Sequence, residues 1–115
     1  MPISQKKIWQ SATKIIPGGN SLLTKRPERF LPDGWPTYFS KSKGFKVWDV
    51  NNRLYLDMSL MGVGTSILGY ANKKVDKKII KRVKGGIIST LNSPDEYKLA
   101  KELIKIDKFA DQVKF

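Results

Sequence analysis

The sequence has neither cysteine nor histidine among its 115 residues. Without cysteine it can form no disulfide or reactive thiolate. Without histidine it lacks the commonest metal ligand and the usual proton carrier near neutral pH, so we expect no ordinary metal site. The longest run without a charge, Met58 to Asn72, contains glycine and serine and is too short to cross a bilayer. The first ten residues lack the apolar segment of a signal peptide, so we expect a cytoplasmic protein without membrane contact.

Acidic residues are scarce: 10 Asp and Glu face 22 Lys and Arg, which gives a formal net charge of +12. Such an excess raises nucleic acid or an anionic surface as a partner, because clustered cations release counterions from phosphates. However, the basic residues are mostly lysines spread from Lys6 to Lys114, with no arginine cluster among aromatic residues that could stack on bases. We therefore predict a solvated, lysine-rich surface without a nucleic-acid partner, and keep a small basic binding module as the alternative.

Local signals predict a mixed α/β chain that begins with a helix followed by an antiparallel sheet. Ser4 can cap the first helix, and the run Pro17-Gly18-Gly19 ends it. Residues 20–36, with prolines at 27, 32 and 36, are expected to be irregular. Aromatic and β-branched residues then predict a three-stranded antiparallel meander over 38–41, 45–50 and 54–57. Asn51 and Asn52 are expected to form a two-residue hairpin turn between the last two strands.

Two further helices are predicted after the uncharged loop. Asn72 caps a helix over residues 73–84, and Gly85 ends it. The last helix begins at Ser93, with Pro94 in its first position and Glu96 in a capping box. Residues 113–115 are typical of the start of a buried strand.

Three polar residues of the hairpin region invite a catalytic interpretation that the spacing does not favour. Asp49 immediately precedes the predicted turn, and no partner acid is placed to share a proton with it or with Asp57. Both are therefore assigned to turn and strand-end chemistry. Tyr70 is expected to pack and to form hydrogen bonds, because an ordinary tyrosine pKa of about 10 is far from working pH.

The segment from Gly44 to Tyr70, GFKVWDVNNRLYLDMSLMGVGTSILGY, resembles the N-terminal region of the class III aminotransferases. These pyridoxal-phosphate enzymes include glutamate-1-semialdehyde aminomutase. The resemblance rests on Trp-Asp-Val-Asn-Asn in the turn, Tyr-Leu-Asp in the next strand, and Ile-Leu-Gly-Tyr, where most relatives have Ile-Leu-Gly-His. It continues upstream in IPGGNS (residues 16–21) and downstream in SPDE (93–96), Leu99-Ala100 and DQVKF (111–115), and so spans nearly the whole chain.

The resemblance implies an N-terminal fragment of a fold type I transaminase or aminomutase whose full-length parent binds pyridoxal 5'-phosphate. It implies that residues 1–70 form the helix and hairpin segment of the small domain, and that residues 71–115 start the large cofactor-binding domain. The Schiff-base lysine of this family lies beyond the chain, so the fragment is expected to be inactive alone. The parent is expected to be a homodimer that acts on small-molecule amino donors and acceptors.

The resemblance also implies site residues. Ser21, Lys25 and Arg26 fall where the aminomutases have an Asn-Ser-Pro-Val-Arg segment that helps bind substrate. Depending on one gap, the arginine position falls on Thr24 or Lys25, with Arg26 adjacent. A cation here would pair with a substrate carboxylate or phosphate.

The loop residues Gly62, Val63, Gly64 and Thr65 are expected near the substrate entrance and the cofactor, where backbone amides can face an anion. A tight connection between hairpin and helix is the alternative. The loop lacks the lysine of a P-loop and the third glycine of a dinucleotide fingerprint. Aminomutases often carry a tryptophan near Val63, and this chain does not. This absence and the unusual NSLLTKRPERFLPDGWP segment favour a transaminase that acts on a substrate other than that of the aminomutases. An aminomutase and such a transaminase both remain open.

Overall fold

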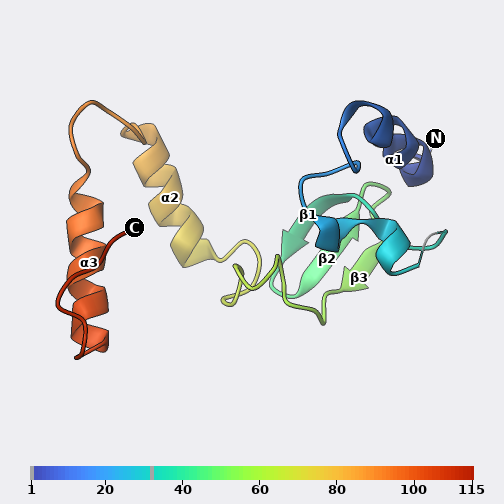
Figure 1. Ribbon diagram of the computed structural model, residues 1–115. Helices are drawn as coiled ribbons and strands as arrows, with labels where there is room; N and C mark the ends of the chain where they lie inside the picture. The colour runs from blue at the N-terminus through green and yellow to red at the C-terminus, as the bar shows by residue number, and fades with distance from the viewer. Residues whose placement is uncertain (1, 32) are drawn as a thin grey trace. The chain divides into compact units, whose positions relative to one another are not determined.

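A computed structural model describes residues 2–31 and 33–115 (Figure 1). Pro32, one of the prolines predicted to interrupt the irregular segment, lies outside the described residues. The chain divides into two compact units, one ending at Asp76 and one running from Lys77 to Phe115. We describe each unit by itself.

The first unit opens with helix α1, Gln5–Ile15, as predicted. The Ser4 hydroxyl accepts a hydrogen bond from the amide of Lys7 at 3.3 Å, and the chain becomes extended at Ile16, before Pro17. The following turn folds back against the helix. A side chain at Gly19 would meet the Trp9 ring at 2.5 Å, so only glycine fits between the turn and the helix.

The sheet contains β1, Phe39–Lys43, β2, Lys46–Asp49, and β3, Leu54–Leu56, paired antiparallel in that order (Figure 1). The predicted meander is confirmed, with Val47 opposite Tyr55 and Trp48 opposite Leu54 across β2 and β3. Lys41 on β1 places its ammonium 4.7 Å from the centroid of the Trp48 ring. An exposed sheet face is thus partly covered by its own cations.

The predicted two-residue turn between β2 and β3 is wrong, because the connection has three residues, Val50 to Asn52. The amide of Asp49 donates to the Arg53 carbonyl at 3.0 Å, and the amide of Asn52 donates to the Asp49 carbonyl at 2.9 Å. Only the second asparagine, Asn52, has a positive φ, of 62°. This is the three-residue hairpin built on a type I turn and a left-handed residue. The Asp49 carboxylate favours it by accepting the amides of Asn51 and Arg53.

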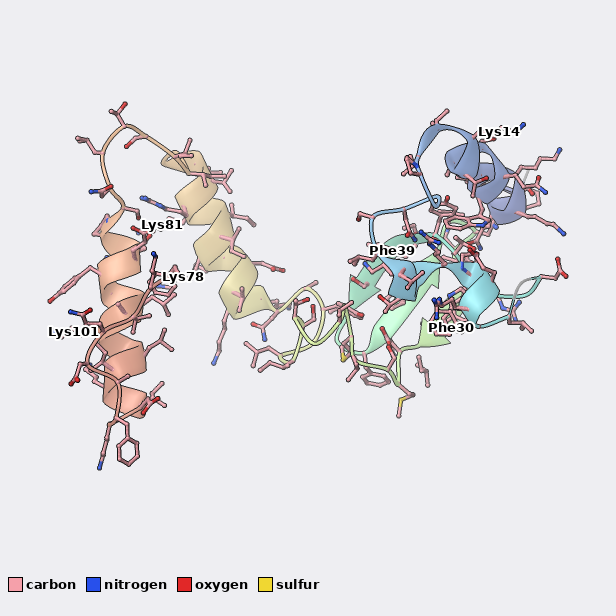
Figure 2. The ribbon with its side chains drawn as sticks, viewed as in Figure 1. Lys14, Phe30, Phe39, Lys78, Lys81 and Lys101 are labelled. Carbon is pink, nitrogen blue, oxygen red and sulfur yellow. The ribbon has the colours of Figure 1, made fainter. Side chains whose placement is uncertain are left out.

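The segment before the sheet is more regular than predicted. It contains two short 3₁₀ helices, η1 over Leu23–Lys25 and η2 over Pro27–Arg29. Pro27 starts η2, where its fixed φ suits a helical first turn and its missing amide costs no hydrogen bond. Beyond them Phe30 (labelled in Figure 2) stacks on Trp35, with ring centroids 4.2 Å apart.

Helix α2, Lys73–Lys84, starts as predicted, because Asn72 Oδ1 accepts the amides of Lys74 and Val75 at 3.1 and 3.3 Å. The helix also ends at Lys84 as predicted, but the glycine with the terminating conformation lies one residue further along than predicted. The left-handed residue is Gly86, with φ of 86°, rather than Gly85, whose amide still donates into the last helical turn.

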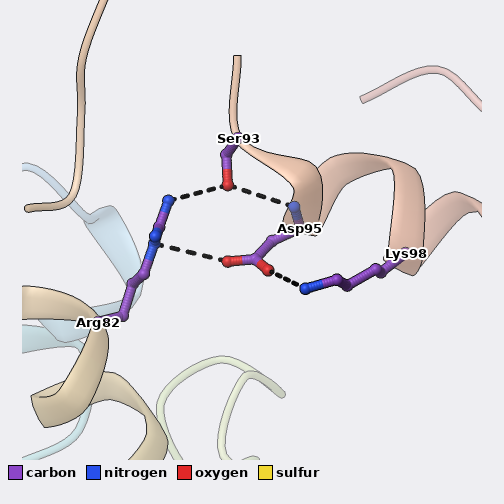
Figure 3. Close-up of polar contacts among 4 residues, drawn as sticks. All are labelled: Arg82, Ser93, Asp95 and Lys98. Carbon is purple, nitrogen blue, oxygen red and sulfur yellow. Dashed lines mark hydrogen bonds and ion pairs between the residues drawn. The ribbon is translucent and has the colours of Figure 1, made fainter. Parts of the chain in front are cut away.

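Helix α3, Pro94–Ile106, begins at the predicted cap. The Ser93 hydroxyl accepts the Asp95 amide at 3.2 Å and also a hydrogen bond from Arg82 Nη2 at 3.0 Å (Figure 3). The Asp95 carboxylate lies 3.5 Å from Arg82 Nε and 3.3 Å from Lys98 Nζ. All three charged side chains are largely exposed, so this cluster orients the helix start and contributes little to stability.

The buried strand predicted at residues 113–115 is absent: these residues are irregular, and Phe115 is 64% exposed. No partner strand is available beside them in the described part of the chain, and a strand needs one. The apolar side chains that the structure describes also lack partner surfaces that would bury them. Among the described residues no large hydrophobic side chain is buried, and Val75, Ile79 and Val83 of α2 are 40 to 54% exposed. None of the described helices has the length and hydropathy needed to span a bilayer.

Candidate functional site

The glycine-rich loop between β3 and α2 is wound tightly, with several residues in the left-handed region. Val63 has φ of 62° and lies between Gly62 and Gly64, at 72° and 80°. A β-branched residue at such a φ is strained, and strain of this kind gathers at functional sites. The Thr65 hydroxyl donates to the Gly62 carbonyl at 2.7 Å and ties the turn together.

Several amides of this loop already have acceptors inside it. The amides of Gly64, Thr65 and Ser66 donate to carbonyls of residues 60, 62 and 61, respectively. In this conformation they are not free to hold an anion. The loop therefore presents small side chains and a strained backbone rather than a phosphate cradle.

A carboxylate and a phenol fasten the two ends of the loop. Asp57 Oδ1 accepts the amide and the hydroxyl of Ser59 at 2.9 and 2.6 Å, and its Oδ2 accepts the Tyr70 hydroxyl at 2.6 Å. Gly44 and Tyr70 exchange both backbone hydrogen bonds at 2.8 Å. The predicted hydrogen-bonding role of Tyr70 is confirmed, and the loop closes onto the hairpin.

The same contacts shift the acidities of both groups. Hydrogen bonds from Ser59 and Tyr70 hold the pKa of Asp57 below its ordinary value. Burial, followed by the bond to the Asp57 carboxylate, raises the pKa of Tyr70 to about 12. Tyr70 therefore stays a neutral donor at working pH, and Asp57 stays an ionised acceptor.

Asp49 is the one buried charged residue in the described part of the chain, only 4% exposed. Its Oδ2 accepts Gln5 Nε2 at 3.0 Å and the Tyr55 hydroxyl at 3.3 Å, while its Oδ1 takes the turn amides. Burial alone would raise the pKa of Asp49, but the bonds from Arg53, Asn51, Tyr55 and Gln5 outweigh it, and the pKa lies below its ordinary value. The assignment of Asp49 to turn chemistry is confirmed. Its hydrogen bond from Gln5 also attaches helix α1 to the hairpin.

The predicted substrate residues differ in their surroundings. Ser21 and Lys25 are exposed, Lys25 as the last residue of η1. Arg26 is half-buried, and its guanidinium lies directly over Gly18. Arg26 Nε and Asn20 Oδ1 are buried atoms without a hydrogen-bond partner among the described residues.

Gly18 and Asn20, both in the PGGN run, were not among the predicted site residues, although Gly18 lies against the Arg26 guanidinium and Asn20 has a buried oxygen without a partner among the described residues. No hydrogen bond joins the 21–26 segment to the 62–65 loop within residues 2–31 and 33–115. Arg26 is therefore half-buried, whereas Ser21 and Lys25 lie at the surface. The predicted substrate residues of the 21–26 segment thus form no hydrogen bond with the predicted cofactor-side loop at 62–65 among the residues that the structure describes. A half-buried guanidinium with an unused donor suits a carboxylate or phosphate.

Comparison with known proteins identifies this architecture. Glutamate-1-semialdehyde 2,1-aminomutase of Aquifex aeolicus is 30% identical over 115 residues, which is 98% of this chain and 26% of that protein. The 3-aminobutyryl-CoA aminotransferase of Cloacimonas acidaminovorans is 31% identical over 97 residues, 84% of this chain and 23% of the relative. The solved FumI protein of Sphingopyxis sp. MTA144, in its PLP internal aldimine form, superposes with a TM-score of 0.81 at 26% identity, over 94% of this chain and 25% of that one.

The chain matches the N-terminal part of the class III pyridoxal-phosphate enzymes. An omega-transaminase from Sphaerobacter thermophilus shares the fold, with a TM-score of 0.79 at 21% identity over 96% of this chain and 24% of its own. No protein-family model matches the sequence. The chain spans about a quarter of the length of the curated class III relatives it matches. The predicted family and the predicted mixed α/β fold are confirmed.

The described residues do not by themselves fit the cofactor of these enzymes. Every lysine side chain is exposed, so none lies in the desolvated pocket that activates a nucleophilic lysine. The amides of the glycine-rich loop at residues 64–66 are occupied. The chemistry that pyridoxal phosphate supplies therefore requires groups outside this segment.

Proposed function

We propose that this chain is the N-terminal part of a pyridoxal-phosphate-dependent aminotransferase or aminomutase, and that it lines the substrate entrance without supplying a catalytic group. The observation that carries the proposal is the match of 98% of the chain to an aminomutase, together with a TM-score of 0.81 to a PLP-bound enzyme. The complete enzyme is a cytoplasmic homodimer. Residues 1–70 belong to its small domain, and residues 71–115 begin the large cofactor-binding domain.

Two segments have distinct roles in this proposal. Ser21, Lys25 and Arg26 bind an anionic group of the substrate, which the half-buried guanidinium of Arg26 supports. The loop of Gly62, Val63, Gly64 and Thr65 lies beside the cofactor and shapes the entrance with small residues. Its strained backbone and its Asp57–Tyr70 closure support this role. The cofactor, when bound, acts as the electron sink for amino-group transfer.

The substrate is a small molecule that carries an amino group and an oxyanion. The relatives that the chain matches are aminomutases and an aminotransferase. The divergent segment around Lys25, and the absence of a tryptophan near Val63, favour transfer between two molecules over an intramolecular mutase.

A double substitution in the complete enzyme tests this function. Replacing Lys25 and Arg26 with Ala should lower kcat/KM roughly tenfold to a hundredfold, mostly through KM, because charge-assisted contacts contribute about 1.5–3 kcal/mol. The cofactor absorbance should stay unchanged. The control replaces Lys77 and Lys78, two exposed lysines of α2, with Ala and should leave kcat/KM as it was.

An unchanged kcat/KM in the Lys25/Arg26 variant would show that these two residues do not bind the substrate. Loss of the cofactor absorbance in that variant would show that the segment of residues 21–26 has a structural role instead. A complete protein that transfers no amino group but binds duplex DNA tightly, and loses that binding in salt, would favour the basic binding module instead.

A further inference from the structure

The turn that ends α1 is shaped around one arginine. Gly18 has φ of 72°, and a β-carbon built on it would lie 2.6 Å from Arg26 Cζ and 3.2 Å from Nε, with Nη2 closer still. Even alanine would have to push the guanidinium aside, since atoms do not approach so closely. The glycine thus leaves a space that the flat guanidinium group fills.

The backbone of Arg26 is held on both sides. Its amide donates to the Leu23 carbonyl at 3.3 Å, which closes η1, and its carbonyl accepts the Arg29 amide at 3.1 Å, which opens η2. The adjacent Lys25 has no comparable enclosure and is exposed. Of the two neighbouring cations, only Arg26 has its direction set by the fold.

The enclosed guanidinium still has a donor to use. Nε of Arg26 is buried and finds no acceptor among the described residues. Nε itself is out of reach of a ligand, but the residue is only half-buried, so an oxyanion that reaches the accessible part of the guanidinium supplies the charged group with an acceptor. A planar fork fixed in place also loses less side-chain entropy on binding than a free lysine.

We propose that Gly18 is a positioning residue for the guanidinium of Arg26, and that Arg26 makes the principal contact with the oxyanion of the substrate, with Lys25 contributing less. The inference rests on the proposed function and goes beyond it in separating the two cations and in giving the glycine a role. A carboxylate and a phosphate offer the same acceptor oxygens to this donor.

The test uses the complete enzyme and two glycines with the same backbone strain. Gly18→Ala should raise KM about tenfold with kcat nearly unchanged, because ground-state and transition-state binding are lost together. Gly86→Ala is the matched control: φ there is 86°, and no atom lies within 4 Å of the added carbon. Both variants carry an alanine in the left-handed region, and only the first touches Arg26.

Further measurements on these and related variants separate the outcomes. Arg26→Ala should raise KM at least as much as Gly18→Ala and clearly more than Lys25→Ala, and the double variant Gly18→Ala/Arg26→Ala should be no worse than Arg26→Ala alone. The NMR signal of the Arg26 side-chain Nε–H should shift in Gly18→Ala and stay in place in Gly86→Ala. Competitive inhibition by succinate and by inorganic phosphate, compared between wild type and Arg26→Ala, identifies which oxyanion the site takes.

The failures are distinguishable. If Arg26→Ala leaves KM unchanged, the substrate role of this segment and the inference fail together. If Arg26→Ala raises KM while Gly18→Ala behaves like Gly86→Ala, only the positioning role is overturned. If Gly18→Ala does not fold, Lys25→Ala and Arg26→Lys still decide between the cations. An equal KM rise in Lys25→Ala, or full retention of affinity in Arg26→Lys, would overturn the assignment to the fixed guanidinium fork.

Discussion

Individual side chains in this structure mainly join segments of the chain through hydrogen bonds. Asp49 is the last residue of β2, and Asp57 directly follows β3. Each carboxylate accepts several hydrogen bonds. Their position was predictable, because aspartate beside a turn accepts nearby amides. The distant partners were not predictable, since Gln5 and Tyr70 reach these carboxylates only through the fold.

The Asp57–Tyr70 bond should make the loop pH-dependent at both extremes. The folded pKa of Tyr70 is raised to about 12, so its stabilisation is complete below its unfolded pKa of about 10 and is lost as pH rises through 12. The folded pKa of Asp57 is lowered, so its contribution is present above its unfolded value of about 3.9 and is lost as pH falls. Amide hydrogen exchange of residues 58–69, measured as protection against pH, should show both limits.

Tyr70→Phe should abolish the alkaline limit and speed loop exchange by about tenfold or more, since a hydrogen bond to a charged group contributes about 1.5 kcal/mol or more. Identical alkaline profiles for wild type and Tyr70→Phe would show that this bond does not close the loop. Tyr38→Phe is the matched control, because the Tyr38 hydroxyl has no hydrogen-bond partner in the described part of the chain.

At the scale of elements, short-range chemistry was predicted well and long-range chemistry poorly. The caps at Ser4, Asn72 and Ser93 depend on residues within one turn and are confirmed. The length of the β2–β3 turn depends on what the Asp49 carboxylate accepts, so the asparagine pair misled the prediction. The strand expected at 113–115 needs a neighbour that no local pattern reveals.

The site was predictable to the same extent. The resemblance located Arg26 within a short segment. The proposed choice between Arg26 and Lys25, and the proposed role of Gly18, needed the turn geometry, because a clash with an absent β-carbon has no signature in the sequence.

Helix α1 should detach when two side-chain contacts are removed. Gln5 joins the helix to Asp49 and to the Tyr38 amide, at 3.0 and 2.8 Å, and Asn51 exchanges two hydrogen bonds with the Ile3 backbone, at 2.7 and 2.9 Å. The variant Gln5→Ala/Asn51→Ala should lose about 1 kcal/mol per bond. Tryptic cleavage after Lys14, exposed on α1 (Figure 2), should accelerate.

Asp33→Ala is the control for this experiment. It breaks the exposed Lys6–Asp33 ion pair of 2.8 Å, which should contribute little, and it leaves every tryptic site intact. Equal cleavage rates for the control and the double variant would mean that α1 is held by something other than Gln5 and Asn51.

At the scale of the molecule, the absence of buried large hydrophobic side chains in the described residues is decisive for the chain in isolation. The 115-residue chain should unfold with weak cooperativity and associate, because exposed apolar helix faces and strand edges seek partners. Sedimentation velocity and thermal unfolding measure this. A sharp two-state transition from a monodisperse monomer would contradict it.

The isolated chain should also form no specific adduct with pyridoxal phosphate. All 18 lysines are exposed, so borohydride reduction should label them weakly and at random. Mass spectrometry of tryptic peptides reads out the distribution. One stoichiometrically labelled lysine would show that the segment holds a nucleophilic site after all.

The hydrogen bonds of the buried Asp49 carboxylate also imply an order in which the parts of this unit fold. Two of its donors lie within four residues and can close the turn while the chain is still short, whereas Gln5 is 44 residues away. Local contacts form in microseconds, and distant ones wait for the intervening chain to be ordered. Helix α1 leaves the ribosome before the hairpin and yet attaches after it, since the carboxylate that accepts Gln5 is available only once Asp49 has been made. The helix at the start of this unit is thus attached after the hairpin that follows it in the sequence.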